Sequence, residues 1–307
     1  MSKIIRFHWR HPYIVVTIFV IKILNVSNLN SHIMTKRSFC VEGALSKVTS
    51  KTGSSNNKRN KETMPAYTFM KESKGAGSTV KVRFTSNDDD DVSRFAIGYW
   101  SIRGLGAPLR MMLCAAKVNH DIYLYDLVEK KDNGWTSEYF VEKSDLVKQA
   151  PLMNLPFVVD RQEERFVCQT NACFVHLGTQ LNMLGSTSME QSQCLEFLCE
   201  LYDIRNIMTD FAYNKYQKDA VKTIKEEAQG VMEAAKRNFL KLESYFQQRD
   251  VLFLVGNRMS APDFHLFEML DQYSGLCHHF ELNKDDDFIA PTYPKLKAFY
   301  ENFISLE

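Results

Sequence analysis

The sequence predicts an α/β domain followed by an all-α domain, both preceded by a long segment of different composition. Three observations support this fold class. Short β-rich and helical patterns alternate from about residue 94 to 183, strand patterns stop at the turn Gly185-Ser186, and the apolar residues beyond it follow helical spacing. We therefore expect units at residues 1–93, 94–183 and 184–307.

The first unit is basic and acid-poor. Residues 1–60 hold ten Lys or Arg and one acid, Glu42. The apolar run at residues 13–24 is broken by Lys22 and is shorter than the about 20 residues that span a membrane, yet it follows a basic start as a signal segment does. Two explanations stay open: a targeting segment, or a start codon assigned upstream of Met34, Met64 or Met70. An intact Met1 in the natural protein would exclude targeting.

A linker is expected at the end of this unit. Residues 71–93 contain Gly75-Ala76-Gly77-Ser78 and an acidic run at residues 88–91. Such a composition buries little apolar surface, so we expect disorder here and order from about Arg94. The expected location is cytoplasmic, or organellar if residues 1–93 include a cleaved targeting peptide.

Composition favours small-molecule chemistry. The formal net charge of +1 offers no electrostatic footprint for nucleic acid. The seven cysteines are odd in number, lack a C-x-x-C spacing and lie mostly among apolar residues, which is typical of reduced thiols inside a core. No set of four metal ligands is evident, so we expect no metal site.

The α/β unit begins with the strand Phe95–Trp100, followed by the loop Ser101-Ile102-Arg103-Gly104 and a helix with Pro108 in its first turn. Further strands are expected at residues 121–126, 157–159 and 165–168, and a helix from Thr170 to about 181. The order β-α-β then β-β-α suits a small mixed sheet flanked by helices.

The last unit contains only helical patterns. Apolar residues recur at helical spacing over residues 194–208 and 221–246, and a final helix is expected from Tyr293 to about 303. Another helix begins at Ser260, whose side chain and that of Asp263 form a capping box.

Three short segments carry chemistry when taken together. Tyr99-Trp100 alone is a pair of aromatics that closes a strand, Asn154-Leu155-Pro156 a turn, and Gln169-Thr170-Asn171 a polar helix start. In this order they resemble the glutathione transferase family. The run Ile97-Gly98-Tyr99-Trp100-Ser101-Ile102-Arg103-Gly104-Leu105, with Pro108 and Arg110, is similar to the mu-class signature, especially that of helminth enzymes. Tyr202-Asp203-Ile204-Arg205 and Tyr213-Asn214 extend the resemblance over about two-thirds of the chain.

The resemblance implies a thioredoxin-like N-terminal domain (βαβ-ββα) followed by an all-helical C-terminal domain. It also implies an enzyme of detoxification and xenobiotic metabolism that adds the thiolate of glutathione, its co-substrate, to hydrophobic electrophiles. Homodimers are expected, with no nucleic acid, no metal and no stable membrane span.

Thiol chemistry explains why such a site needs a tyrosine. A cysteine thiol titrates near ~8.5, so little of it is ionised at neutral pH, and only the thiolate is a good nucleophile. Lowering that pKa by about two units requires roughly 2.7 kcal/mol, and one hydrogen bond to a charged group contributes about 1.5 to 3 kcal/mol. A phenol stays protonated and donates to the sulfur. The Tyr99-Trp100 pair favours Tyr99 for this role over Ser101, the rival donor.

The rest of the glutathione site follows from the resemblance. Leu155 pairs its main chain with the cysteinyl unit, with the Leu155-Pro156 bond cis, and Gln169 and Thr170 receive the γ-glutamyl carboxylate at a helix start. Asp203 reaches the γ-glutamyl amine across the dimer interface. Trp135 and Lys143 hold the glycyl end, because Tyr139 stands where a lysine is expected. Trp100, Asn154 and Pro156 complete the binding residues, and Tyr213 contacts the electrophile.

Two departures from the mu pattern change what we expect of the dimer contact and of the electrophile site. Leu152-Met153 stands where mu enzymes have an aromatic residue that inserts into the partner subunit, which predicts a weaker or different dimer contact. The chain ends at Leu306-Glu307, where mu enzymes continue over the active site, which predicts a more open electrophile site.

Two other functions stay open. One is a glutathione-dependent isomerase of the prostaglandin-synthase type, and the other is a non-catalytic ligand-binding or structural relative. Tyr99, Gln169 and Asp203 together argue against the second. Disulfide exchange is disfavoured because the first strand-helix turn has no cysteine.

Overall fold

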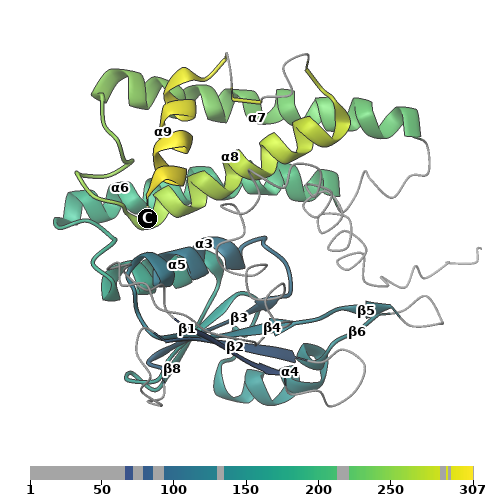
Figure 1. Ribbon diagram of the computed structural model, residues 1–307, viewed down its shortest axis with the longest axis vertical. Coiled ribbons are helices and arrows are strands. Elements are labelled where there is room, and N and C mark those ends of the chain that lie inside the picture. The colour runs from purple at the N-terminus through teal and green to yellow at the C-terminus, as the bar shows by residue number, and fades with distance from the viewer. Residues whose placement is uncertain are drawn as a thin grey trace, which may run out of the picture.

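The computed structural model describes residues 66–71, 79–85, 93–129, 135–212, 221–283, 288–289 and 292–306. Figure 1 shows a sheet with helices on both faces in one half and a group of long helices in the other. The predicted fold class, a mixed α/β domain followed by a helical domain, is confirmed.

Four strands form the predicted mixed sheet. Strand β3 pairs in parallel with β4 and antiparallel with β7, and β7 pairs antiparallel with β8. The strands are β3 (Phe95–Trp100), β4 (His120–Tyr125), β7 (Phe157–Asp160) and β8 (Arg165–Cys168). A separate two-stranded sheet consists of β5 (Val128–Glu129) and β6 (Trp135–Thr136).

Two further strands extend the sheet at the outer edge of β4. They are β1 (Ala66–Lys71) and β2 (Thr79–Thr85), and the complete order is β1-β2-β4-β3-β7-β8. The expectation that order begins near Arg94 is therefore wrong. The glycine-rich composition of residues 75–78 predicts a linker, whereas the β-prone sequences on both sides of it pair with each other. The predicted targeting segment, apart from these strands, lies outside the described residues.

Helices cover both faces of the sheet. Helices α3 (Gly106–Ala115) and α5 (Thr170–Gln180) lie between the sheet and the helical domain, and α4 (Glu138–Gln149) lies on the opposite face (Figure 1). On the α3 and α5 face, Phe95 and Ile97 pack into one core that continues into the helical domain. On the α4 face, Tyr125, Tyr139 and Phe157 belong to a second, smaller core.

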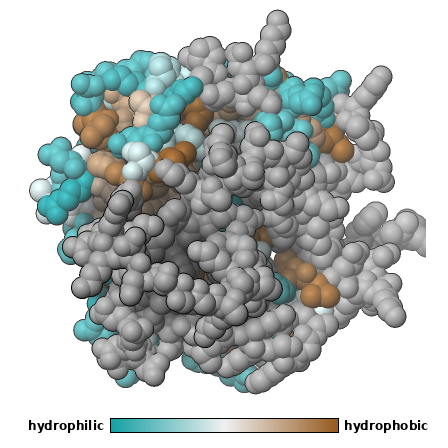
Figure 2. All heavy atoms as spheres, in the orientation of Figure 1, coloured by the Kyte–Doolittle hydropathy of each residue, from teal (hydrophilic) through white to brown (hydrophobic). Residues whose placement is uncertain are grey.

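The helical domain comprises α6 (Ser188–Asp210), α7 (Val221–Arg249), α8 (Ala261–Phe280) and α9 (Pro294–Ser305). The capping box predicted at Ser260 is confirmed: the Asp263 carboxylate reaches back and accepts from the Ser260 main-chain N–H at 2.8 Å and from the Ser260 hydroxyl at 2.6 Å. Burial raises the pKa of Asp263 to about 6. On the face of the molecule that Figure 2 shows, hydrophilic and hydrophobic residues are intermixed over the described part of the chain.

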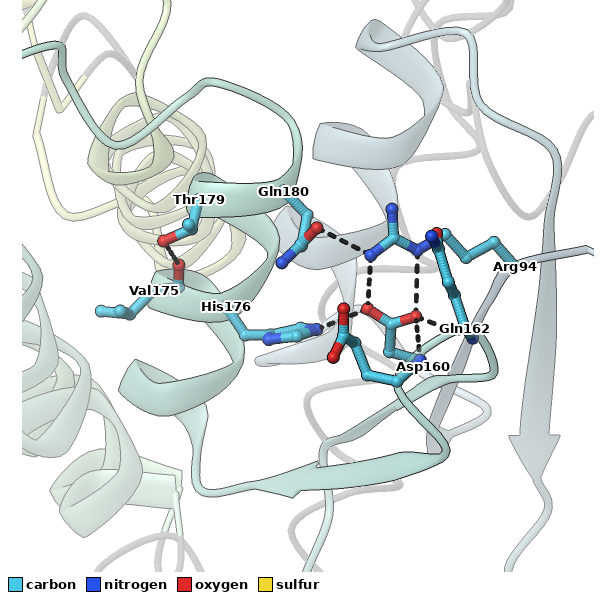
Figure 3. Close-up of polar contacts among 8 residues, drawn as sticks. Arg94, Asp160, Gln162, Val175, His176, Thr179 and Gln180 are labelled. Atoms are coloured by element: carbon cyan, nitrogen blue, oxygen red, sulfur yellow. Dashed lines mark hydrogen bonds and ion pairs between the residues drawn. The ribbon is translucent and has the colours of Figure 1, made fainter.

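A buried carboxylate joins β3, β7 and α5 at the start of β3 (Figure 3). Asp160 is fully buried and accepts from Arg94 Nε at 3.0 Å and Nη2 at 2.9 Å. His176 Nε2 lies 3.1 Å from the second oxygen of Asp160, and Arg94 also donates to Gln180 at 2.7 Å. Burial alone would raise the pKa of Asp160, but the hydrogen bond and charge of Arg94 hold that pKa below its ordinary value.

The described residues contain neither a candidate membrane-spanning helix nor a candidate metal cluster. No helix in the described ranges has the length and apolar character that a membrane crossing requires. The same ranges contain no group of three or more His, Cys, Asp or Glu arranged to hold a metal ion. The six cysteines in these ranges are free thiols, and Cys173, Cys194 and Cys277 are buried, as the sequence predicts.

Candidate functional site

The three predicted motifs lie at the same end of three neighbouring strands of the sheet. Gly98 of β3 lies opposite Phe157 of β7, and Phe157 lies opposite Cys168 of β8. The same register, continued by one residue, places Tyr99, Pro156 and Gln169 in a row across the ends of the three strands. Segments far apart in the sequence are therefore neighbours here.

Tyr99 lies against the turn that follows its own strand. Its side chain is 5% exposed, and a Cβ built on Gly104 would lie 2.7 Å from its hydroxyl oxygen. A Cβ on Gly106 would lie 2.6 Å from Cδ1 of the same ring. Gly104 also has φ +39°, where a side chain is strained. Only glycine at these two positions lets the loop close on the phenol.

The Asn154-Leu155-Pro156 segment leads into β7. Its Leu155-Pro156 peptide bond is cis, as the resemblance implies. Leu155 packs in the small core on the α4 face together with Trp100, while Asn154 is exposed. The segment therefore crosses the end of the sheet beside the strand that ends in Tyr99-Trp100.

Gln169 occupies the residue before α5 in a sparsely populated backbone conformation. Its φ is 73° and its ψ 126°, and its side chain makes no capping hydrogen bond. A non-glycine residue in this region costs about 1–3 kcal/mol, and such residues cluster at binding and active sites. Thr170, the next residue, is buried at the first turn of α5, whose main-chain N–H groups lack helical partners and suit an anion.

Asp203 lies exposed on α6. It lines a cleft of about 350 Å³ between α6 and α7, to which Asn206 and Val231 also contribute. One helical turn earlier, Cys199 Sγ lies 3.9 Å from Asn171 Nδ2 at the start of α5. The face of α6 that carries Asp203 therefore adjoins the helix start that follows Gln169.

The residues around the expected binding position for the glycyl end of glutathione are mainly aromatic. Tyr139, at the position expected for a lysine, is 2% exposed and packs edge-on to Trp100 with ring centres 5.3 Å apart. Burial, with a smaller contribution from Cys168, raises the pKa of Tyr139 to about 12, so a neutral phenol stands where the resemblance implies a lysine cation. Lys143, one turn later, is exposed and its Nζ lies 5.5 Å from the centre of the Tyr139 ring. Trp135 belongs to the short strand β6.

Three predicted features have different outcomes. Tyr213, the predicted electrophile contact, lies outside the described residues. Leu152, at the expected dimer position, is 72% exposed, whereas Met153 is buried. Ser101, the rival thiol donor, is half-buried in the turn, where its main-chain N–H donates to Tyr125 at 3.0 Å.

Sequence reasoning missed the polar contacts of Arg103. The sequence presents this residue only as part of the Tyr99 motif, whereas in the structure its guanidinium pairs with Glu268 and Asp271 of α8. The signal in the sequence is that Glu268 and Asp271 lie one turn apart among the apolar residues of α8, because buried charges need partners.

Known proteins match both parts of the chain. Residues 202–307 match the family described as "Glutathione S-transferase, C-terminal domain". The chain is 28% identical over 215 residues to Glutathione S-transferase Mu 1 of Rattus norvegicus, which covers 69% of this chain and 86% of the relative. It is 29% identical over 206 residues to Glutathione S-transferase P 10 of Caenorhabditis elegans, covering 66% of this chain and 82% of the relative.

A solved structure shows the same fold. The structure of a monomeric glutathione S-transferase from Necator americanus superposes with a TM-score of 0.54 at 14% identity, over 69% of this chain and 92% of that one. The family match, the mu-class relative and the shared fold make this chain similar to glutathione S-transferases, and to those of the mu class among them.

Proposed function

We propose that this protein is a glutathione transferase that adds the thiolate of glutathione to hydrophobic electrophiles, with Tyr99 as the catalytic residue. The observation that supports this most is the register that aligns Gly98, Phe157 and Cys168 across three strands, because their chain neighbours are Tyr99, Pro156 and Gln169. The tyrosine lies near the end of β3, the cis Leu155-Pro156 bond comes directly before β7, and the start of α5 comes just after β8. These groups suit a thiol, a peptide and a carboxylate.

In the proposed binding mode, each part of glutathione contacts a different group of the protein. Tyr99 donates its hydroxyl hydrogen to the sulfur and so stabilises the thiolate. Leu155 pairs main chain to main chain with the cysteinyl unit, and the start of α5 at Gln169 and Thr170 receives the γ-glutamyl carboxylate. Asp203 holds the γ-glutamyl amine, and Lys143, with Trp135, serves the glycyl carboxylate. Trp100 and Asn154 line the site, and Tyr213 faces the electrophile.

Affinity and turnover test this function directly. We expect the full chain to be retained on immobilised glutathione, to be released by free glutathione, and to conjugate an aryl halide. Neither retention nor turnover would favour a non-catalytic relative. Retention with isomerisation of an endoperoxide and no conjugation would favour the isomerase.

The close packing of Gly106 on Tyr99 gives a first prediction. Gly106→Ala places a methyl group 2.6 Å from the Tyr99 ring, so the ring must move. Because a misplacement of about 1 Å costs up to about 100-fold in rate, we expect kcat/KM to fall about 10-fold. Gly230→Ala is the control, since its added methyl meets open space on α7. Equal activity of both variants would show that the ring position does not matter.

We also propose a homodimer in which Asp203 serves the partner's site. Leu152 is 72% exposed at the expected contact, so Leu152→Asp should convert the dimer to a monomer in light scattering. Leu252→Asp, at a leucine that is 66% exposed elsewhere, should leave the dimer intact. A wild-type protein that is monomeric at micromolar concentration would remove Asp203 from the partner's site.

A further inference from the structure

The turn after β3 is tied to the helical domain by a charged side chain. Arg103 Nη2 lies 2.7 Å from Glu268 Oε2, and Nη1 is in close contact with Asp271 Oδ2. The two acids are one turn apart on α8, and their side chains are 1% and 12% exposed. The guanidinium therefore spans the boundary between the two domains with both of its terminal nitrogens engaged.

Neighbouring side chains orient both acids. Tyr300 of α9 donates its hydroxyl hydrogen to the second oxygen of Asp271 at 2.5 Å. Gln272 donates to the second oxygen of Glu268 at 2.8 Å. Each carboxylate thus faces Arg103 with one oxygen and is held in place through the other.

The main chain of Arg103 belongs to the turn that encloses Tyr99. The Arg103 carbonyl accepts from the N–H groups of Gly106 at 3.1 Å and Ala107 at 2.9 Å. The next residue, Gly104, lies so close to the Tyr99 hydroxyl that a Cβ there would be 2.7 Å from its oxygen. A shift of Arg103 therefore moves the atoms beside the phenol oxygen.

We propose that Arg103 is a positioning residue for Tyr99, and that Glu268, Asp271 and Tyr300 hold it from the helical domain. The inference rests on the proposed role of Tyr99. The anchored turn keeps the hydroxyl hydrogen directed toward the thiol, so the helical domain contributes to thiol ionisation without contacting the sulfur.

Two mild variants test the proposal. Arg103→Lys keeps the charge but replaces the two terminal nitrogens, each of which faces one acid, with a single ammonium group, and Tyr300→Phe removes only the hydrogen bond to Asp271. We expect the pH midpoint of kcat/KM to rise by about one unit in Arg103→Lys, a loss of about 10-fold below the midpoint, and by less in Tyr300→Phe. Hydrogen exchange of residues 101–105 should be faster in both variants. Tyr245→Phe is the control, because it removes a hydroxyl that donates to Leu254 at 2.7 Å.

A double variant separates positioning from simple stability. In a Tyr99→Phe background, Arg103→Lys should produce no further shift of the pH midpoint, because the hydroxyl that it positions is gone. A loss of stability with an unchanged midpoint, or additive shifts in the double variant, would overturn the proposal. A wild-type enzyme that does not lower the thiol pKa would overturn the role of Tyr99 and this inference with it. A wild-type enzyme that lowers it, with unshifted variants, would overturn this inference alone.

Discussion

Tyr99→Phe should lower kcat/KM roughly 50-fold near pH 6.5, and the loss should shrink as the pH approaches about 8.5. The reason is the pH dependence of the nucleophile. If the phenol lowers the thiol pKa by about two units, about half of bound glutathione is thiolate near pH 6.5, against about 1% without it. At high pH both enzymes hold thiolate, so the advantage disappears. Steady-state rates measured across this pH range check the prediction.

Tyr125→Phe is the matched control for this substitution. Tyr125 lies on the neighbouring strand and donates to Glu142 at 3.1 Å on the α4 face of the sheet. Its loss should leave the pH profile in place. Glutathione affinity should change little in Tyr99→Phe, since the tripeptide is held mainly through its main chain and carboxylates. A uniform loss of rate at every pH would contradict thiol ionisation by Tyr99.

Asp160→Asn should have the largest effect on stability. The substitution removes the charge that faces Arg94, whose side chain is 30% exposed, and a hydrogen-bonded charged pair of this kind contributes about 2 kcal/mol. A loss of about 2 kcal/mol corresponds to a fall in Tm of about 4 to 8 °C for a folded region of about 200 residues. Asp250→Asn is the control: its side chain is 90% exposed and pairs with Lys295, so its Tm should not change measurably.

The pH dependence of this stability has a defined sign. The pKa of Asp160 is lowered in the folded protein from an ordinary value of 3.8. The stabilisation is therefore complete above that ordinary value and is lost as the pH falls through the lower folded pKa. The stability difference between wild type and Asp160→Asn should be constant above about pH 5 and shrink below about pH 4. A difference that grows on acidification would contradict this account.

Local patterns were enough to predict most of the fold. The β-rich composition of Phe95–Trp100 and the Ser260-Asp263 capping box are properties of short segments, so they can be recognised without knowing what packs on them. The strands Ala66–Lys71 and Thr79–Thr85 were missed because glycine-rich and acidic runs flank them. Their pairing with β4 depends on contacts between segments distant in the sequence.

The site residues also divide into those that a local motif predicts and those whose contacts join distant parts of the sequence. Tyr99 and Gln169 were predicted because each sits in a short motif at a strand end. Arg103 and Asp271 are 168 residues apart, and Arg94 and Asp160 are 66 apart, so no local pattern links them. The spacing from Trp135 identified Tyr139 as the residue in place of a lysine, but its burial against Trp100 depends on how α4 packs on the sheet.

The most direct test of the account is a titration of the thiol of glutathione bound to the wild-type protein. Thiolate absorbance followed against pH should give a midpoint about two units below the ~8.5 of a free thiol, and Tyr99→Phe should return it toward that value. A midpoint near that of the free thiol in the wild type, or the same lowered midpoint in Tyr99→Phe, would contradict the assignment of Tyr99.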